Sequence, residues 1–211
     1  MTELVERYRQ TDHRRRVAAH NEAAFEDARI WLGQHRSELI LDVGCGTGQS
    51  TSILARQHPD ARIIGLDKSA VRLDKHQATS ADNYLLLRAD ARDFWYLARR
   101  EDWRVDQLYL LYPNPYPKPR QVQRRWHASP AMPDLMAISA RVEVRSNWRL
   151  YCQEFAHACA LYGRRCELTS FTTDQPISAF EKKYLQAGQT CWRLQCRREP
   201  DTEVPQATIP A

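Results

Sequence analysis

Three glycines at alternate positions follow a short apolar segment and constrain the fold of this chain more than any other feature. Residues 39–48 read LILDVGCGTG, and the polar residues Gln49, Ser50 and Thr51 come next. Glycine has no Cβ atom and tolerates positive φ, so this pattern predicts a buried strand that turns sharply into a helix. The N–H groups at the start of such a helix point toward the loop. The segment therefore suits close contact between bare backbone and a ligand.

A second apolar segment, residues 62–67, follows at the spacing of one strand–helix–strand unit and ends in Asp67. An acid at the end of the second strand is where nucleotide-binding α/β proteins bind ribose hydroxyls. The glycine spacing differs from the G-x-G-x-x-G of dinucleotide sites. Asp42, two residues before the first glycine, would repel a pyrophosphate but suits a ligand that carries an ammonium group. These features favour S-adenosylmethionine over NAD; the alternative is an ordinary strand-to-helix turn without a ligand.

The expected cofactor site combines this loop with the ends of the next two strands. Asp42 and the loop backbone would hold the methionine part, Asp67 the ribose, and Asp90 with Ala91 the adenine. Asp90 follows a predicted strand at residues 84–87, and it can equally serve as the N-cap of the next helix. The expected cofactor-binding residues are Asp42, Gly44, Cys45, Gly46, Gly48, Asp67, Lys68, Asp90 and Ala91.

Length and composition limit the class of protein. A chain of 211 residues suits a single α/β domain, and a net charge of +5 is compatible with an acidic partner. The six cysteines form no C-x-x-C pair, so we expect reduced core residues and no metal site. Residues 1–10 are charged, unlike a signal peptide, and no apolar segment is long enough to span a membrane. We expect a soluble, cytoplasmic protein.

Hydrophobic periodicity predicts a doubly wound, Rossmann-like, seven-stranded mixed sheet in one α/β domain. Strands are expected at residues 38–43, 62–67, 84–87, 105–111, 141–145, 165–170 and 190–196. Helices are expected at residues 11–31, 50–57 and 148–161, from residue 69, near residue 94, and from Ser129-Pro130. Residues 1–34 would form a helical extension, residues 35–198 the domain, and residues 199–211 a disordered tail.

A rigid, basic segment follows the predicted strand at residues 105–111. Four prolines occur within residues 113–119, and they restrict the backbone where a second substrate would approach the sheet. Positive side chains are concentrated in and just after this stretch, as binding of a phosphate backbone requires. They are Lys118, Arg120, Arg124 and Arg125. The alternative is a stiff surface loop with a solvated basic rim.

The segment resembles the P-D-P-W-x-K-x-R-H-x-K-R-R stretch of the bacterial tRNA (guanine-N7)-methyltransferases, the TrmB family. Residues 146–148 resemble its T-D-[NW] motif, residues 178–181 its T-x-[FY]-E motif, and residues 188–194 its last strand. The glycine loop resembles motif I of S-adenosylmethionine-dependent methyltransferases. The resemblance covers residues 39–194 and implies methyl transfer from S-adenosylmethionine to N7 of a guanine in tRNA. We therefore expect tRNA as the partner of a monomer or homodimer.

The sequence departs from the family pattern where the nucleobase would lie. Asn114 and Asn147 stand where the family has aspartates, and Gln121, Val122, Gln123 and Ser178 are further substitutions. The resemblance implies that Asn114 lies at the junction of cofactor and target base, as the catalytic residue. It implies phosphate contacts for Lys118, Arg120, Arg124 and Arg125, and a base pocket lined by Asn147, Ser178 and Glu181.

Guanine N7 carries a lone pair, so methylation needs positioning and stabilisation of a base that becomes cationic. Asparagine keeps an acceptor oxygen but loses the charge, which costs about 1–2 kcal/mol at each position. Three alternatives stay open. Asn114-Pro115-Tyr116 resembles part of the [DN]-P-P-[FY] motif of enzymes that methylate exocyclic amines. The second alternative is a small-molecule methyltransferase, and the third is a relative that binds cofactor or RNA without catalysis.

Overall fold

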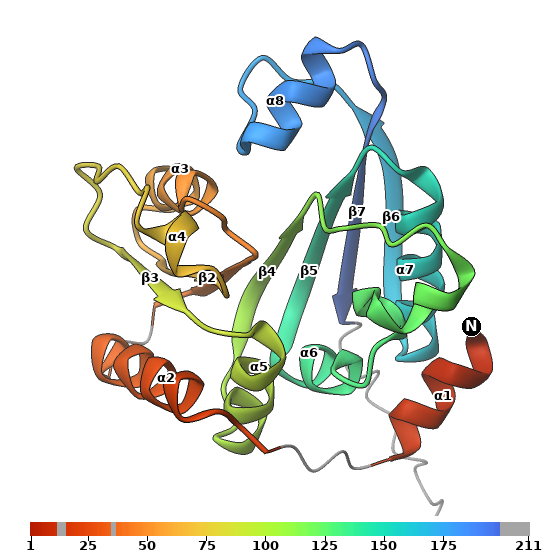
Figure 1. The fold of residues 1–211 in the computed structure, drawn as a ribbon, viewed down its shortest axis with the longest axis horizontal. Helices are drawn as coiled ribbons and strands as arrows, with labels where there is room; N and C mark the ends of the chain where they lie inside the picture. Colours follow the sequence, from red (N-terminus) through yellow and green to blue (C-terminus); the bar gives the residue numbers. More distant parts are fainter. Residues whose placement is uncertain (12–15, 35–36, 199–211) are drawn as a thin grey trace, which may run out of the picture.

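The computed structural model describes residues 1–11, 16–34 and 37–198, which form a single domain around one seven-stranded sheet (Figure 1). The strand order is β3-β2-β1-β4-β5-β7-β6. Strands β1 to β5 pair in parallel, whereas β7 is antiparallel to both β5 and β6. The predicted mixed sheet is thereby confirmed. Its strands are β1 (Leu39–Val43), β2 (Arg62–Asp67), β3 (Tyr84–Arg88), β4 (Val105–Leu111), β5 (Ser139–Ser146), β6 (Arg164–Phe171) and β7 (Cys191–Arg198).

Helices connect the strands and precede the sheet. The α-helices are α1 (Thr2–Gln10), α2 (Ala19–Leu32), α3 (Gln49–Gln57), α4 (Ala70–Leu73), α5 (Ala91–Arg100), α6 (Met132–Ile138), α7 (Arg149–Leu161) and α8 (Ala179–Gln186). Two short 3₁₀ helices, η1 (Pro119–Arg124) and η2 (Trp126–Ala128), follow β4. Within residues 1–11, 16–34 and 37–198, no helix combines the length and apolar character that crossing a membrane requires.

Apolar side chains cover both faces of the central strands, as a doubly wound sheet requires. On one face, Phe25 of α2, Phe94 of α5 and Phe155 of α7 belong to the larger core. On the other face, Leu54 of α3 packs with Ile40 of β1 and with residues of β2 and β4. Helices therefore cover both faces of the sheet around β1, β2 and β4. The carboxyl ends of these parallel strands all lie at one edge of the sheet.

One glycine of β2 sets how closely α3 approaches the sheet. A Cβ atom at Gly65 would lie 2.4 Å from Thr51 Oγ1 and 2.6 Å from Leu86 Cδ2. Only a residue without a side chain fits there. The close packing of α3 on β2 fixes the start of α3 beside the ends of β1 and β2.

Several predicted helices differ from the observed ones. The helix predicted for residues 11–31 begins only at Ala19, the first ten residues contain a separate helix, and residues 12–15 lie outside the description. Helix α6 begins at Met132 rather than at Ser129-Pro130, because the Ser129 hydroxyl donates to the Trp126 carbonyl instead of capping α6. Helix α8 has no counterpart in the predicted elements. The predicted tail, residues 199–211, also lies outside the described residues.

Candidate functional site

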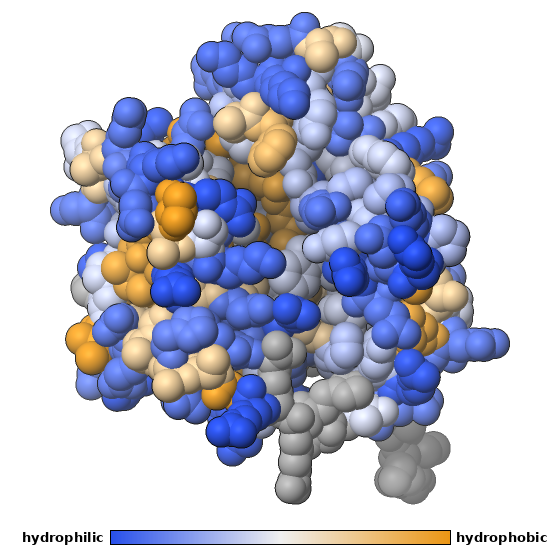
Figure 2. Space-filling model, viewed as in Figure 1, coloured by the Kyte–Doolittle hydropathy of each residue, from blue (hydrophilic) through white to orange (hydrophobic). Residues whose placement is uncertain are grey.

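The predicted site residues lie along the edge where the parallel strands end. The glycine loop leaves β1 there, Asp67 ends β2, and the proline-rich segment leaves β4. Helix α8 lies beyond the ends of β4 and β5 in Figure 1. Figure 2 shows a hollow in the surface below α8, with apolar side chains visible inside it. In doubly wound folds this edge is where ligands bind.

The glycine loop has the backbone that its sequence predicts. Gly44, Gly46 and Gly48 adopt φ values of +75°, +64° and +77°. The Leu66 carbonyl of β2 accepts hydrogen bonds from the N–H groups of Gly44 (2.7 Å) and Cys45 (3.1 Å), which fixes the loop on the sheet. A Cβ atom at Gly44 or Gly46 would meet nothing within 4 Å. The loop is thus rigid on one side and open on the other.

Gly48 differs from the other two glycines because it is enclosed. A Cβ atom there would lie 2.5 Å from Leu86 Cδ1 and 2.8 Å from His76 Nδ1. His76 itself contacts the Thr47 carbonyl through Nδ1 (2.9 Å) and the Tyr84 hydroxyl through Nε2 (2.8 Å). His76 supports the loop from behind, and no sequence motif had indicated it.

Asp42 joins the end of β1 to the first turn of α3. Its Oδ2 atom accepts hydrogen bonds from the hydroxyls of Ser50 (2.5 Å) and Thr51 (2.7 Å), and the residue is buried. Burial raises the pKa of Asp42 to about 6, although the two hydroxyls oppose this shift. These bonds give Asp42 a structural role under the loop. Its contact with a ligand ammonium group stays a prediction.

Asp67 braces the glycine loop from the end of β2. Its carboxylate accepts hydrogen bonds from the N–H groups of Gly46 (2.9 Å) and Ser69 (2.8 Å). Arg72, which the sequence had not indicated, forms an ion pair with this carboxylate at 3.0 Å. The Asp67 side chain is about 1% exposed. Lys68 is exposed beside it. Because this carboxylate is almost fully enclosed, a ribose hydroxyl would have to displace one of its partners, and Arg72, whose side chain is about half exposed, is the side chain among these partners.

Asp90 is the N-cap of α5. Its Oδ1 atom accepts a hydrogen bond from the Arg92 N–H (2.9 Å), and Arg92 also forms an ion pair with it. The Asp90 N–H donates to Asn21 Oδ1 (3.0 Å), which ties α2 to this point. The capping alternative is confirmed. Contacts of Asp90 and the buried Ala91 with adenine stay predictions.

The segment after β4 has a strained backbone. Tyr112 and Tyr116 adopt positive φ values, +51° and +43°, which bulky residues rarely do. Between them, Asn114 is exposed, and its Oδ1 atom accepts a hydrogen bond from the Tyr116 N–H (3.1 Å). Such strain persists only where surrounding contacts enforce it, and it is concentrated at functional sites. It presents the Asn114 amide to solvent at the end of β4.

The four predicted phosphate-binding residues fall into two groups. Lys118, Arg120 and Arg124 are exposed, and the Arg124 guanidinium lies 5.9 Å from the centre of the Tyr116 ring. Arg125 is buried instead. Its guanidinium donates to the Tyr116 carbonyl (3.0 Å) and forms an ion pair with Glu154. This geometry gives Arg125 a role in supporting the loop, and its predicted contact with a phosphate stays a prediction.

Glu154 connects this loop to a buried histidine that the sequence had not indicated. The His127 Nε2 atom lies 3.2 Å from the Glu154 carboxylate, and the ring packs against Tyr151 and Phe155. Burial lowers the pKa of His127, and the adjacent Glu154 opposes this shift. The conformation of the proline-rich segment thus depends on contacts with α7, far along the chain.

Glu181 anchors α8 to the sheet. It is fully buried, and its carboxylate accepts hydrogen bonds from the Tyr112 hydroxyl (3.2 Å), Arg145 Nη1 (3.0 Å) and the Ile177 N–H (2.7 Å). Ser178 caps α8 by accepting a hydrogen bond from the Glu181 N–H (3.1 Å). Two residues of the predicted base pocket therefore hold α8 in place, and their contact with a base stays a prediction.

Asn147 lies half-buried after β5, where its Nδ2 atom donates to Gln189 Oε1 (2.9 Å). This contact brings the turn after α8 beside the end of β5. Asn147, Ser178 and Glu181 are thus grouped around α8, as the predicted base pocket requires. Asn147 and Ser178 are partly exposed, whereas Glu181 is fully buried. Gln189 was not indicated by any motif.

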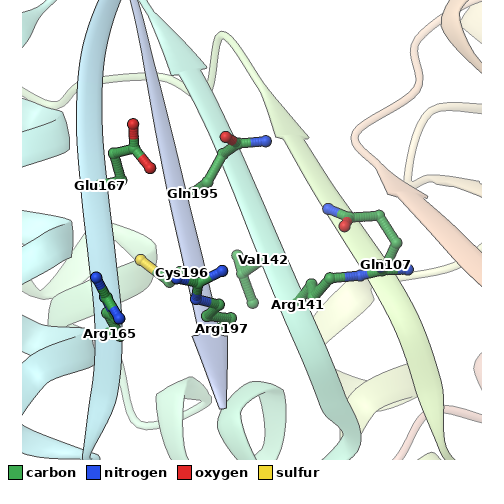
Figure 3. A pocket seen from close by; sticks show the side chains of 8 residues that line it. All are labelled: Gln107, Arg141, Val142, Arg165, Glu167, Gln195, Cys196 and Arg197. Carbon is green, nitrogen blue, oxygen red and sulfur yellow. The ribbon is translucent and has the colours of Figure 1, made fainter. Parts of the chain in front are cut away.

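A pocket elsewhere lies on the open face of β4, β5, β7 and β6, away from the glycine loop (Figure 3). The neighbouring strand positions Arg141 and Arg197 contribute to it, and the opposed pair Glu167 and Gln195 lies beside them. Figure 3 shows these side chains standing on the sheet rather than around a closed cavity. None of the predicted site residues lines this pocket, so we do not include it in the candidate site.

Comparison with known proteins places this fold and site in a family. The family model described as "Putative methyltransferase" matches residues 36–194 of the chain. The chain belongs to this family. The predicted resemblance to a methyltransferase family is confirmed.

Two curated relatives share one name with each other. The tRNA (guanine-N(7)-)-methyltransferase of Limosilactobacillus reuteri (strain DSM 20016) is 33% identical over 119 residues, which are 52% of this chain and 55% of that protein. The enzyme of that name from Rubrobacter xylanophilus is 28% identical over 172 residues, 76% of each chain. This chain therefore spans about half the length of the first of these relatives.

Among solved structures, the 16S rRNA methyltransferase KamB has a TM-score of 0.60 with this family member. The two are 18% identical, and the match covers 88% of this chain and 96% of KamB. At this level of identity the match establishes the fold alone.

Proposed function

We propose that this family member is an S-adenosylmethionine-dependent tRNA methyltransferase that modifies N7 of a guanine. The observation that carries the proposal is that the glycine loop and the basic segment lie at the same edge of the sheet. The glycine loop, open at Gly44 and Gly46, lies beside Asp67, and the strained, basic segment leaves the neighbouring strand β4. The description shared by the curated relatives supports the same substrate and reaction.

The residues of the loop fit the cofactor in their chemistry. At Gly44 and Gly46 there is open space where a side chain would otherwise stand, so a ligand can approach the loop backbone closely. The carboxylate of Asp67 can accept hydrogen bonds from a diol beside the loop once the diol displaces one of its present partners, such as the half-exposed Arg72. We assign Gly44, Cys45, Gly46, Gly48 and Asp67 to cofactor binding, with Lys68, Asp90 and Ala91 at its edge. The cofactor supplies an electrophilic methyl group on a sulfonium.

The chain itself has to position the guanine and stabilise its positive charge. Asn114 presents an amide at the end of β4, and its Oδ1 atom can accept a hydrogen bond from the base while it keeps the Tyr116 N–H. Lys118, Arg120 and Arg124 extend this surface outward with positive charge that suits RNA phosphates. Because N7 needs no deprotonation, no general base has to be assigned.

The proposal is tested by the identity of the product. The purified full chain is incubated with labelled S-adenosylmethionine and total tRNA, and the modified nucleoside is identified by mass spectrometry. We expect 7-methylguanosine, and we expect little label with the Asp67→Asn variant. The Glu26→Gln variant is the matched control, because Glu26 is an exposed acid on α2 paired only with Arg29 among the contacts described for it. A label on an exocyclic amine, or none at all with a folded protein, would reject the proposal.

A further inference from the structure

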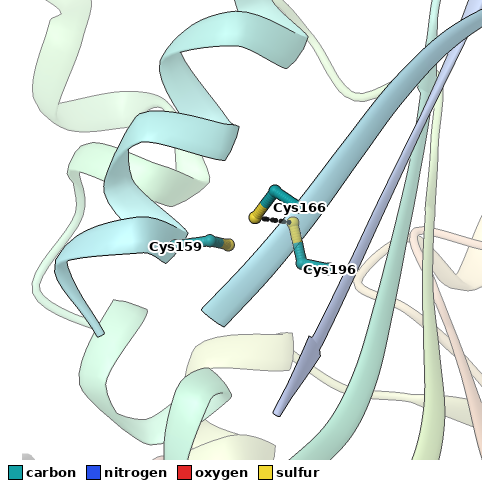
Figure 4. Close-up of side chains that lie close together, drawn as sticks. All are labelled: Cys159, Cys166 and Cys196. Atoms are coloured by element: carbon teal, nitrogen blue, oxygen red, sulfur yellow. Dashed lines mark hydrogen bonds between the residues drawn. The ribbon is translucent and has the colours of Figure 1, made fainter. Parts of the chain in front are cut away.

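Three cysteines from separate elements converge between α7 and the last two strands. Cys159 lies near the end of α7, Cys166 near the start of β6, and Cys196 near the end of β7. Their Sγ atoms all lie within 4.8 Å of one another (Figure 4). We call them the thiol cluster. It shares no residue with the candidate methyltransferase site.

Strand pairing places two members of the thiol cluster together. Cys166 and Cys196 are directly opposed in the antiparallel pair β6–β7, so both side chains leave the same face of the sheet. Their Sγ atoms are 2.8 Å apart. Figure 4 shows that Cys159 extends from α7 toward this pair. The three sulfur atoms therefore face a common point rather than lying in a row.

We propose that Cys159, Cys166 and Cys196 bind a thiophilic divalent metal ion of the zinc type. Three sulfur ligands at about 2.3 Å from such an ion lie about 3.8–4.0 Å from one another. The three Sγ atoms already lie within 4.8 Å, so the triangle has the right size. The Cys166 and Cys196 sulfur atoms have to separate by about 1 Å, which a small rotation about either Cα–Cβ bond provides.

The charge near the thiol cluster matches a divalent ion. Three thiolates and one divalent ion carry a net charge of about −1. Arg164, two residues before Cys166, interacts electrostatically with all three cysteines. Its guanidinium is held by the carbonyls of Met136, Ser139 and Ala140, so its positive charge is fixed in place. This fixed positive charge offsets part of the negative charge of the thiolates.

Exposure gives an entry route and room for a fourth ligand. Cys159 and Cys196 are buried, whereas Cys166 is only partly buried, on the edge strand β6. An ion can enter past Cys166, and a water molecule there can complete a tetrahedron. A bound ion would cross-link α7, β6 and β7, so binding would stabilise the fold.

The test measures zinc binding by the full, reduced, metal-free chain in competition with a chromogenic chelator. We expect one equivalent, with about three sulfur neighbours at about 2.3 Å in zinc X-ray absorption spectra. Cys166→Ser should weaken zinc binding by more than the roughly 10- to 100-fold that loss of a supporting contact costs. Cys152→Ser, in the same helix as Cys159 but outside the cluster, should leave the affinity unchanged.

A second measurement uses the unmodified chain and so does not depend on the folding of a variant. Alkylation of the partly buried Cys166, mapped by mass spectrometry, should slow when zinc is present. The proposal is overturned by absence of zinc binding in the reduced protein or by unchanged affinity in Cys166→Ser. A Cys166–Cys196 disulfide in a protein whose reduced form ignores zinc would overturn it equally.

Discussion

Arg125 forms an ion pair with Glu154, while its neighbour Arg124 extends into solvent over the Tyr116 ring. Adjacent residues of one basic segment thus have opposite tasks. One holds the loop from beneath, and the other is free to meet a ligand at its surface. This contrast provides a matched pair of variants.

Arg125→Ala should lower the free energy of unfolding by about 2–4 kcal/mol, because Glu154 and the Tyr116 carbonyl lose their buried partner. Chemical denaturation monitored by circular dichroism measures this loss. A change within about 0.5 kcal/mol would show that the ion pair does not support the loop.

Arg124→Ala should leave stability within about 0.5 kcal/mol of the parent, because the side chain is exposed. It should weaken tRNA binding and lower the slope of log affinity against log salt by about 1, as loss of one phosphate contact requires. Filter binding over a series of salt concentrations measures both. The exposed Arg56 of α3 offers a control, and Arg56→Ala should leave the slope unchanged.

Gly48→Ala should destabilise the protein more than Gly163→Ala. Both glycines have positive φ, +77° and +69°, so both alanines carry similar backbone strain. Only at Gly48 would the new Cβ atom collide with Leu86 and His76, which adds about 1–3 kcal/mol. Thermal unfolding of the two variants gives the comparison, and equal losses would contradict the enclosed geometry of Gly48.

The raised pKa of Asp42 predicts how stability depends on pH. Its ordinary value is 3.8, and burial raises it to about 6, so the folded protein binds this proton more tightly than the unfolded chain. The contribution of Asp42 is therefore complete below about pH 4 and is lost as pH rises to about 6, on the order of 3 kcal/mol in all.

Asp42→Asn removes this titration. As pH rises from 4 to 6, the parent should therefore lose unfolding free energy relative to the variant. Urea denaturation at several pH values measures that difference. Asp60→Asn, at an exposed turn, is the control. A difference independent of pH for Asp42→Asn would mean that the carboxyl group is not desolvated as the structure indicates.

Asn114→Asp should raise the rate of N7 methylation about tenfold, because a full negative charge stabilises the cationic product by about 1–2 kcal/mol more than an amide does. The aspartate keeps the acceptor that binds the Tyr116 N–H, so the loop should retain its conformation. Single-turnover kinetics with tRNA measure the rate. An unchanged or lower rate would place Asn114 away from the developing charge.

Local patterns in the sequence were enough for the glycine loop, most strand positions and the basic segment, because each depends on neighbouring residues. Periodicity predicted β2 and β4 at their observed bounds, and three glycines predicted positive φ. The start of α6 was misplaced, since the Ser129 hydroxyl found a nearer partner in the Trp126 carbonyl.

Only the tertiary structure decided which side chains of those patterns are available. Arg124 and Arg125 look alike in sequence, and what separates them is Glu154 on a later helix. Glu181 is withdrawn from the surface by Arg145 and Tyr112. The thiol cluster has no spacing that a motif describes, because strand register and the packing of α7 bring its sulfur atoms together. Sequence sets what each residue can do chemically, and long-range packing sets which atoms remain to do it.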